Sequence, residues 1–192
     1  SGHDIGKITM IGELVAVQMQ RKKIDRDKTP LKKLYRLASD TDKEKWKSAI
    51  ESEGAILEKA KRIIEEAKLE MKLSDVEFQG DKSKATFYYT AEKRVDFREL
   101  IREYSRQFGV RIEMRQIGVR QESAKIGGIG SCGRELCCST WMTEFSSVST
   151  GAARYQQLSI NPQKISGQCG RLKCCLNFEL DGYTEALKEF PS

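Results

Sequence analysis

The apolar positions between residues 53 and 72 follow one another at intervals of three and four, with charged residues between them. They are Ile56, Leu57, Ala60, Ile63, Ile64, Ala67 and Met71. An amphipathic helix has this period because one turn takes about 3.6 residues. The pattern predicts a helix over residues 53–72 whose apolar stripe faces the core. A helical segment with Trp46 and Ile50 precedes it, with Thr41 or Asp42 as its predicted N-cap.

Three later segments have the composition and alternation of β-strands. Residues 76–78 and 85–90 flank a turn around Gly80, and the second segment is rich in the aromatic and branched residues that strands favour. In residues 110–114 apolar and charged residues alternate, which is typical of a half-buried strand. We therefore predict a hairpin followed by a third strand.

A further helix is predicted between the hairpin and the third strand. Asp96 and Glu99 suit reciprocal capping of its first turn, and Gly109 suits its C-terminal end. The order helix, strand, strand, helix, strand indicates the α+β class, with helices on one face of a small, mostly antiparallel sheet. A cysteine-rich region of loops and helices follows this layer.

The chain opens with two apolar segments, residues 5–10 and 13–20, which we interpret as short strands around Gly12. Because the chain starts abruptly with such a segment, we expect the first part of that domain to be missing. The predicted division is an N-terminal β segment over residues 1–24, a helical region over 25–72 and an α+β domain over 73–192.

All six cysteines lie in two copies of the heptapeptide Cys-Gly-Arg-x-x-Cys-Cys, 37 residues apart. The copies contain Cys132, Cys137 and Cys138, and Cys169, Cys174 and Cys175. Clustered thiols suit a soft metal, which usually takes four thiolates. Adjacent cysteines point in different directions, so the expected set is Cys132 and Cys169 with one cysteine from each vicinal pair. Zinc and an iron–sulfur cluster are both compatible, and reduced structural thiols or disulfides are the alternatives.

The net charge of +6 is concentrated around the two motifs. Residues 111–175 contain nine lysines and arginines against four acidic residues, a net charge of +5. Such a region suits an anionic partner, namely RNA, DNA or an acidic protein surface, although a solvated surface has the same composition. The candidate contacts are Arg134, Arg154, Lys164, Arg171 and Lys173. Arg134 and Arg171 also favour thiolate formation beside them.

A second hypothesis is an RNA- or DNA-binding module whose reduced thiols are structural. The aromatic run Phe87–Tyr89 offers faces on which bases could stack. The alternative is that these rings pack against the helices.

The sequence gives little support for catalysis. His3 is the only histidine, and neither a Gly-x-Ser-x-Gly elbow nor the Cys-x-x-Cys pair of thiol oxidoreductases occurs. We therefore expect a protein that is not an enzyme, with a thiol–disulfide redox sensor as a weaker alternative. The chain has no run of about 18 apolar residues and no signal-peptide pattern, so we expect a cytoplasmic location without membrane insertion.

Two blocks around the cysteine motifs resemble the RicT (YaaT) family, which carries the polymerase-suppressor-protein type of C-terminal domain. The blocks are residues 127–138 and 157–175, within a resemblance that runs from about Asp75 to Glu179. The start of the chain, Gly2–Lys7, is similar to a barrel-like N-terminal segment of the family. The run Thr150–Arg154 departs from the family, in which a Met-Ala-Lys-like sequence is expected.

The resemblance implies a cytoplasmic regulatory or adaptor protein. Family members join two small helical partner proteins, are associated with iron–sulfur clusters and influence RNA processing by a membrane-bound endoribonuclease. Carried over by position, all six cysteines are cluster-related residues. The expected cofactor is an iron–sulfur cluster of the four-iron type, with zinc as the alternative. The expected partners are small helical proteins, together with RNA or an endoribonuclease.

Overall fold

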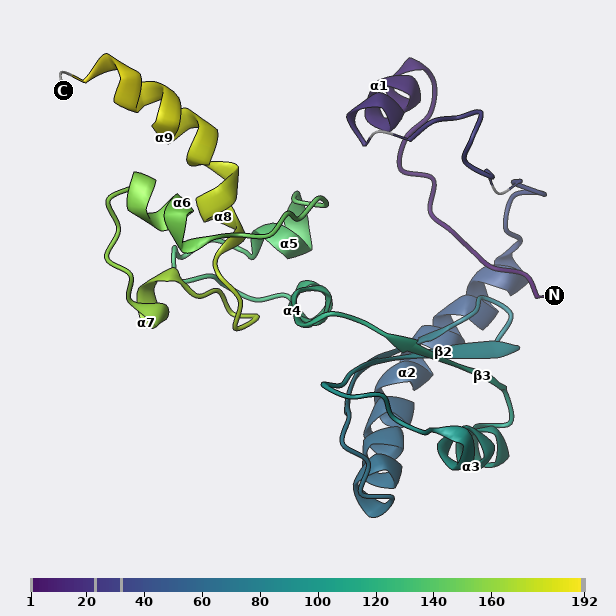
Figure 1. Ribbon diagram of the computed structural model, residues 1–192. Helices are drawn as coiled ribbons and strands as arrows, with labels where there is room; N and C mark the ends of the chain where they lie inside the picture. The colour runs from purple at the N-terminus through teal and green to yellow at the C-terminus, as the bar shows by residue number, and fades with distance from the viewer. Residues whose placement is uncertain (1, 23, 32, 191–192) are drawn as a thin grey trace.

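The computed structural model describes residues 2–22, 24–31 and 33–190. A three-stranded sheet with helices α2 (Asp40–Glu66) and α3 (Arg98–Phe108) forms one part of the molecule (Figure 1). Helix α4 (Val119–Ile126) leads from the sheet to the cysteine-rich part, whose helices are short. These are α5 (Cys137–Thr140), α6 (Thr150–Tyr155), α7 (Pro162–Ile165), α8 (Cys174–Phe178), α9 (Leu180–Ala186) and the 3-10 turn η1 (Leu187–Glu189).

The sheet has the strand order β1–β2–β3 and confirms the α+β class. Strands β1 (Lys72–Phe78) and β2 (Lys84–Thr90) form the predicted antiparallel hairpin. Strand β3 (Arg111–Gln116) pairs with β2 in parallel, so the sheet is mixed rather than mostly antiparallel. The reason is the connection, because α3 returns the chain to the starting end of β2 before β3 begins, as parallel pairing requires.

Helices α2 and α3 cover one face of this sheet, as predicted. Strand β2 directs Ala85, Phe87 and Tyr89 into a core that includes Ile64 of α2 and Tyr104 of α3. The phenol of Tyr104 is fully buried and donates a 2.9 Å hydrogen bond to the carbonyl of Ala60. Burial raises the pKa of this phenol, because the charged form would lose its hydration. The two helices and the hairpin therefore share a single core.

The aromatic run of β2 belongs to the protein interior. Phe87, Tyr88 and Tyr89 expose 0%, 9% and 6% of their surfaces. Phe87 packs against Tyr104, with ring centroids 4.7 Å apart. The interpretation of these rings as surfaces for base stacking is therefore wrong, and the packing alternative is confirmed.

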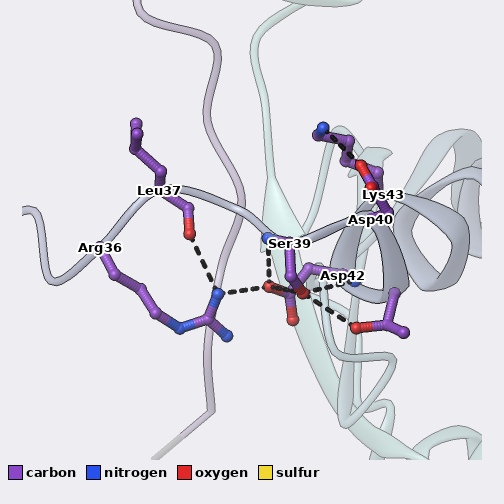
Figure 2. Close-up of polar contacts among 7 residues, drawn as sticks. Arg36, Leu37, Ser39, Asp40, Asp42 and Lys43 are labelled. Atoms are coloured by element: carbon purple, nitrogen blue, oxygen red, sulfur yellow. Dashed lines mark hydrogen bonds and ion pairs between the residues drawn. The ribbon is translucent and has the colours of Figure 1, made fainter.

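Helix α2 is one continuous helix that begins earlier than the apolar stripe alone predicted. Ser39 is its N-cap, and its hydroxyl accepts from the backbone N–H of Asp42 (Figure 2). The Asp42 carboxylate bonds back to the N–H of Ser39 at 2.8 Å, which completes a capping box. Arg36 lies 2.5 Å from the same carboxylate and helps to hold the pKa of Asp42 well below its usual range. The predicted caps, Thr41 and Asp42, lie inside the first turn instead.

Helix α3 ends as predicted but begins differently. Gly109 terminates it in the left-handed conformation, at φ +66°. The N-cap is Phe97, whose side chain makes no capping bond, so the predicted capping box is wrong. Asp96 lies one position too early for that role and accepts from the N–H of Arg98, while Glu99 pairs with Arg102 at 2.6 Å.

The N-terminal strands are not formed in this structure. Residues 3–11 have no regular secondary structure, and residues 13–21 form helix α1 (Glu13–Arg21). Backbone groups need partners, and without a partner strand among the described residues a helix satisfies them locally. Residues 3 and 4 lie against the β1–β2 turn, where the N–H of His3 donates to Asp81 and Asp4 accepts from the N–H of Gly80.

Helix α4 was not predicted. It packs against the sheet face opposite α2 and α3. Glu122 is buried. Its carboxylate accepts a 3.1 Å hydrogen bond from the hydroxyl of Ser74 and forms a 2.9 Å ion pair with Lys72, both of β1. Lys125 pairs with Asp75 at 2.9 Å, and its ammonium lies 4.1 Å from the centroid of the Tyr88 ring. These contacts fix α4 to the sheet. Across the described ranges no helix is long and apolar enough to cross a membrane.

Replacing Ser39 with alanine removes the side-chain acceptor of the α2 cap. We expect S39A to lower the free energy of unfolding by about 1 kcal/mol, because a first-turn N–H loses its partner. Urea unfolding followed by circular dichroism measures this change. S149A is the matched control, because Ser149 is the N-cap of α6 but its side chain makes no capping bond. Equal stability of S39A and S149A would contradict the assigned cap.

Candidate thiol site

The first cysteine motif folds into a closed turn between Gly128 and Leu136. The N–H of Gly130 donates to the carbonyl of Arg134 at 2.8 Å, and the N–H of Gly133 donates back to Gly130 at 3.0 Å. A third bond, from the N–H of Leu136 to the carbonyl of Gly128 at 3.0 Å, closes the base of the turn. The backbone alone therefore fixes the shape of this motif.

The second motif repeats the same bonds 37 residues later. The N–H of Gly167 donates to Arg171 at 2.8 Å, and the N–H of Gly170 donates to Gly167 at 3.0 Å. The N–H of Lys173 closes this turn on the carbonyl of Ile165 at 2.9 Å. The sequence duplication is thus also a structural duplication.

A glycine at positive φ makes each turn feasible. Gly133 and Gly170, which directly follow the first cysteine of each motif, have φ values of +78° and +73°. Residues with a Cβ rarely adopt this conformation. The space beside both glycines is open, so the backbone conformation is what selects glycine here.

Each turn delivers a vicinal cysteine pair to the first residues of a short helix. Cys137 and Cys138 begin α5, and Cys174 and Cys175 begin α8. All six cysteines are free; Cys132 is exposed, and the other five are partly buried. The structure therefore presents six reduced thiols in two equivalent frames.

The vicinal pairs of the two motifs lie within electrostatic reach of each other. Burial raises the pKa of the Cys174 thiol, and the charges of Cys137, Cys175 and Cys138 raise it further. Burial likewise raises the pKa of the Cys175 thiol, and the charge of Cys137 adds to this effect. The structure thus brings together thiols whose motifs are 37 residues apart.

An aromatic contact extends the duplication beyond the cysteines. Trp141 follows the last cysteine of the first motif by three residues, and Phe178 follows that of the second by the same interval. Their ring centroids are 4.7 Å apart in an edge-to-face arrangement, and both rings remain largely exposed. Both rings also line a hollow of about 880 Å³ that Cys174 reaches. Equivalent positions of the two copies are therefore in contact.

Buried apolar residues support the second motif from behind. Ala152 and Ala153 of α6 pack with Ile165 and Leu176. The side chain of Gln156 also donates to the carbonyl of Leu176 at 2.6 Å. The run 150–154, which departs from the expected family pattern, thus supplies two small core residues at this point.

The donors suit a soft metal, but they do not converge on one point in this structure. Thiols of this kind bind zinc or iron–sulfur clusters. Within residues 2–22, 24–31 and 33–190, no three Cys, His, Asp or Glu side chains are placed to hold a metal ion. Closing a site would require the thiols to move toward one another. The set of Cys132 and Cys169 with one cysteine from each pair stays a prediction.

The predicted contact residues lie around this site. Arg134, Arg154, Lys164 and Arg171 are exposed, and Lys173 is partly buried, where its charge acts on Cys175. In the described part of the chain none of the five forms a salt bridge. Their side chains are therefore available to an anionic partner.

Sequence reasoning missed Arg120, which lies outside both motifs. Its guanidinium donates to the carbonyl of Leu172 at 3.4 Å and lies 5.1 Å from the centroid of the Phe145 ring. Its charge also opposes the rise in the pKa of Cys174. No local pattern marks this residue, because its contact with Leu172 spans 52 residues.

Two regions of the chain match conserved regions of known proteins. Residues 32–117 match the PSP1 C-terminal conserved region, and residues 147–190 match the third domain of PSP1-like proteins. The chain belongs to the PSP1-like family. The first cysteine motif lies between the two matched regions, and the second lies within the third domain.

Curated relatives agree with this membership. Stage 0 sporulation protein YaaT of Bacillus subtilis is 48% identical over 165 residues, which cover 84% of this chain and 59% of that protein. Protein PSP1 of Saccharomyces cerevisiae is 49% identical over 45 residues, 23% of this chain and 5% of PSP1. Uncharacterized protein PB7E8.02 of Schizosaccharomyces pombe is 45% identical over 51 residues, 27% and 7% of the two chains. No solved structure matches.

The resemblance found in the sequence is therefore confirmed. The chain spans about 59% of the length of the Bacillus relative. The activity and partners of the complete proteins are accordingly matters of proposal for this chain.

Replacing Gly170 with alanine forces a residue with a Cβ into positive φ. We expect G170A to lower the free energy of unfolding of the cysteine-rich part by about 1 to 2 kcal/mol. Hydrogen exchange at the N–H groups of Gly167 and Lys173 measures the change locally. G182A is the control, because Gly182 lies in α9 with open space beside it, and alanine there favours the helix. Unchanged protection in G170A would contradict the described turn.

Proposed function

We propose that the chain is a non-enzymatic regulatory or adaptor protein that binds a metal centre through its duplicated cysteine motifs. The centre is an iron–sulfur cluster of the four-iron type, with zinc as the alternative. The observation that carries this proposal is the equivalence of the two turns. Each presents its vicinal thiols at the start of a helix, and the charge of Cys137 in the first pair acts on Cys174 in the second.

Metal binding would order this region by stabilising one arrangement of the two motifs. Ligation supplies free energy only when the thiols have reached their coordinating positions, so the metal stabilises the closed arrangement. The closed arrangement would fix residues 127–138 and 167–175 relative to each other. The exposed basic residues beside them would then be held in one geometry for a partner.

Assembly with partner proteins is the regulatory part of the proposal. Family resemblance points to small helical partners and to an effect on RNA processing, through RNA or an endoribonuclease, in the cytoplasm. The exposed Arg134, Arg154, Lys164 and Arg171 provide a basic surface beside the thiols that suits an acidic partner face. The curated name of the Bacillus relative places that protein in sporulation.

The proposal is tested by purifying the chain without oxygen and measuring its visible spectrum, iron, acid-labile sulfide and zinc. We expect either a brown protein with matched iron and sulfide or a colourless one with bound zinc. Cys174→Ser should lose most of the bound metal, because its thiol belongs to the second pair and is the one on which the charges of the first pair act. Ser139→Ala, which alters an exposed side chain beside Cys138, should retain it.

A metal-free wild-type chain would not end the test, since a partner could complete the coordination. The measurement is therefore repeated after mixing with the small helical partners of a family member. A chain that holds no metal in either condition, with all six thiols free, would overturn the proposal.

An RNA-binding module with structural thiols is the second candidate. The exposure of the four arginine and lysine side chains without carboxylate partners favours it. The burial of Phe87–Tyr89 removes the stacking surface first assigned to it.

Salt dependence distinguishes a direct RNA contact. If phosphates bind these side chains, the affinity for single-stranded RNA, measured by fluorescence anisotropy, should fall steeply between 50 and 200 mM salt, roughly as the number of contacts predicts. Replacing Arg134 and Arg171 together with alanine should reduce the slope by about 1 to 2. Binding that is absent at low salt would rule out this candidate.

A further inference from the structure

Arg120 is fixed at its base by the sheet. The N–H of Ile117, three residues earlier, donates to the carbonyl of Tyr89 at 2.9 Å, and Ile117 is buried. The side chain of Gln121 accepts from the N–H of Gly118 at 3.0 Å and caps the start of α4. Glu122, two residues after Arg120, is buried against β1. The backbone of Arg120 therefore belongs to the rigid sheet layer.

The head of Arg120 reaches the cysteine-rich part at two separate segments. Its guanidinium donates to the carbonyl of Leu172 inside the second motif, and it lies over the ring of Phe145, which follows the first motif. Phe145 adjoins Ser146, whose hydroxyl accepts from Asn177 of α8 at 2.8 Å. A single cation thus contacts the second motif and the loop that follows the first vicinal pair.

The duplication shows that this contact is specific to one copy. Glu135 is the equivalent of Leu172 in the first motif, and within the described ranges no arginine side chain bonds to its carbonyl. Arg120 therefore breaks the equivalence of the two frames and places a fixed positive charge on the second.

We infer that Arg120 is the positioning residue that holds the two cysteine motifs together and supplies the charge that balances their thiolates when a metal binds. This inference rests on the proposed metal-binding function. A divalent metal with four thiolates carries a net charge of −2, and a partly buried anion of this kind needs a nearby cation. Arginine suits the role because it stays charged and its planar head can bond and stack at the same time.

The test measures Co²⁺ binding to the reduced chain under anaerobic conditions. Sulfur-to-cobalt charge-transfer absorption reports thiolate ligation, and a competing chelator gives the affinity. We expect R120M to weaken Co²⁺ binding by about 10- to 100-fold, the usual effect of losing an outer-shell partner. R120K keeps the charge but not the planar head that lies over Phe145, so it should recover only part of the loss. R62A is the control, because it removes an equal charge from an exposed site on α2.

The outcomes distinguish the role of Arg120 from the proposed metal binding on which it rests. If the wild type shows the charge-transfer band and R120M binds Co²⁺ as tightly, the inference about Arg120 is wrong and the proposed function stands. If R120K is as weak as R120M, a role in balancing charge is wrong. If the wild type shows no band, either alone or mixed with the small helical partners, the proposed function fails and the inference fails with it. Circular dichroism confirms that each variant is folded, and methionine keeps a long side chain that can pack on the Phe145 ring without the charge.

Discussion

The closed turn that precedes each vicinal cysteine pair is the constraint on which the cysteine-rich part depends. Its three backbone bonds require a residue at positive φ directly after the first cysteine, and both copies have glycine there. The turn then delivers the chain into a helix whose first two residues are the cysteine pair. Because the backbone sets this geometry, the two cysteines of a pair occupy equivalent backbone positions in both copies. Side-chain contacts alone decide how the copies face each other.

Those contacts differ between the two copies. The second copy is backed by a small apolar cluster that includes Ala153 and Leu176. The first copy has no such cluster among the described residues and packs against α4 instead. Since α4 is bound to the sheet through Glu122 and Lys125, the first copy takes its position from the sheet layer. The geometry of a site built between the two copies therefore depends both on the sheet layer, which positions the first copy, and on the apolar cluster, which positions the second.

Patterns that depend on neighbouring residues predicted the fold well. The apolar stripe of α2, the alternation in β3 and the terminating Gly109 all follow from local geometry and were confirmed, although α2 ends at Glu66 and not at residue 72. The parallel direction of β3 depends on how α3 returns the chain, which no local pattern encodes. The segment 13–20 is equally apolar in a strand or a helix, and only the absence of a partner strand among the described residues favours the helix.

The candidate site shows the same division. The repeated heptapeptide identified the thiols and the nearby arginines, because the signal lies in the residues themselves. The effect of the Cys137 charge on Cys174 and the contact of Arg120 with Leu172 come from tertiary packing, so the sequence could not reveal them. The predicted capping box of α3 was wrong by one position, because Asp96 directly precedes Phe97, the actual N-cap.

The contact between Trp141 and Phe178 gives this region an optical reporter of its own. The chain has two tryptophans, and the other, Trp46, lies in α2 within the sheet layer. With Trp46 replaced by phenylalanine, all indole emission would come from a ring that touches the opposite copy. The colour and intensity of that emission would then follow the separation of the two copies directly, without any label attached to a cysteine.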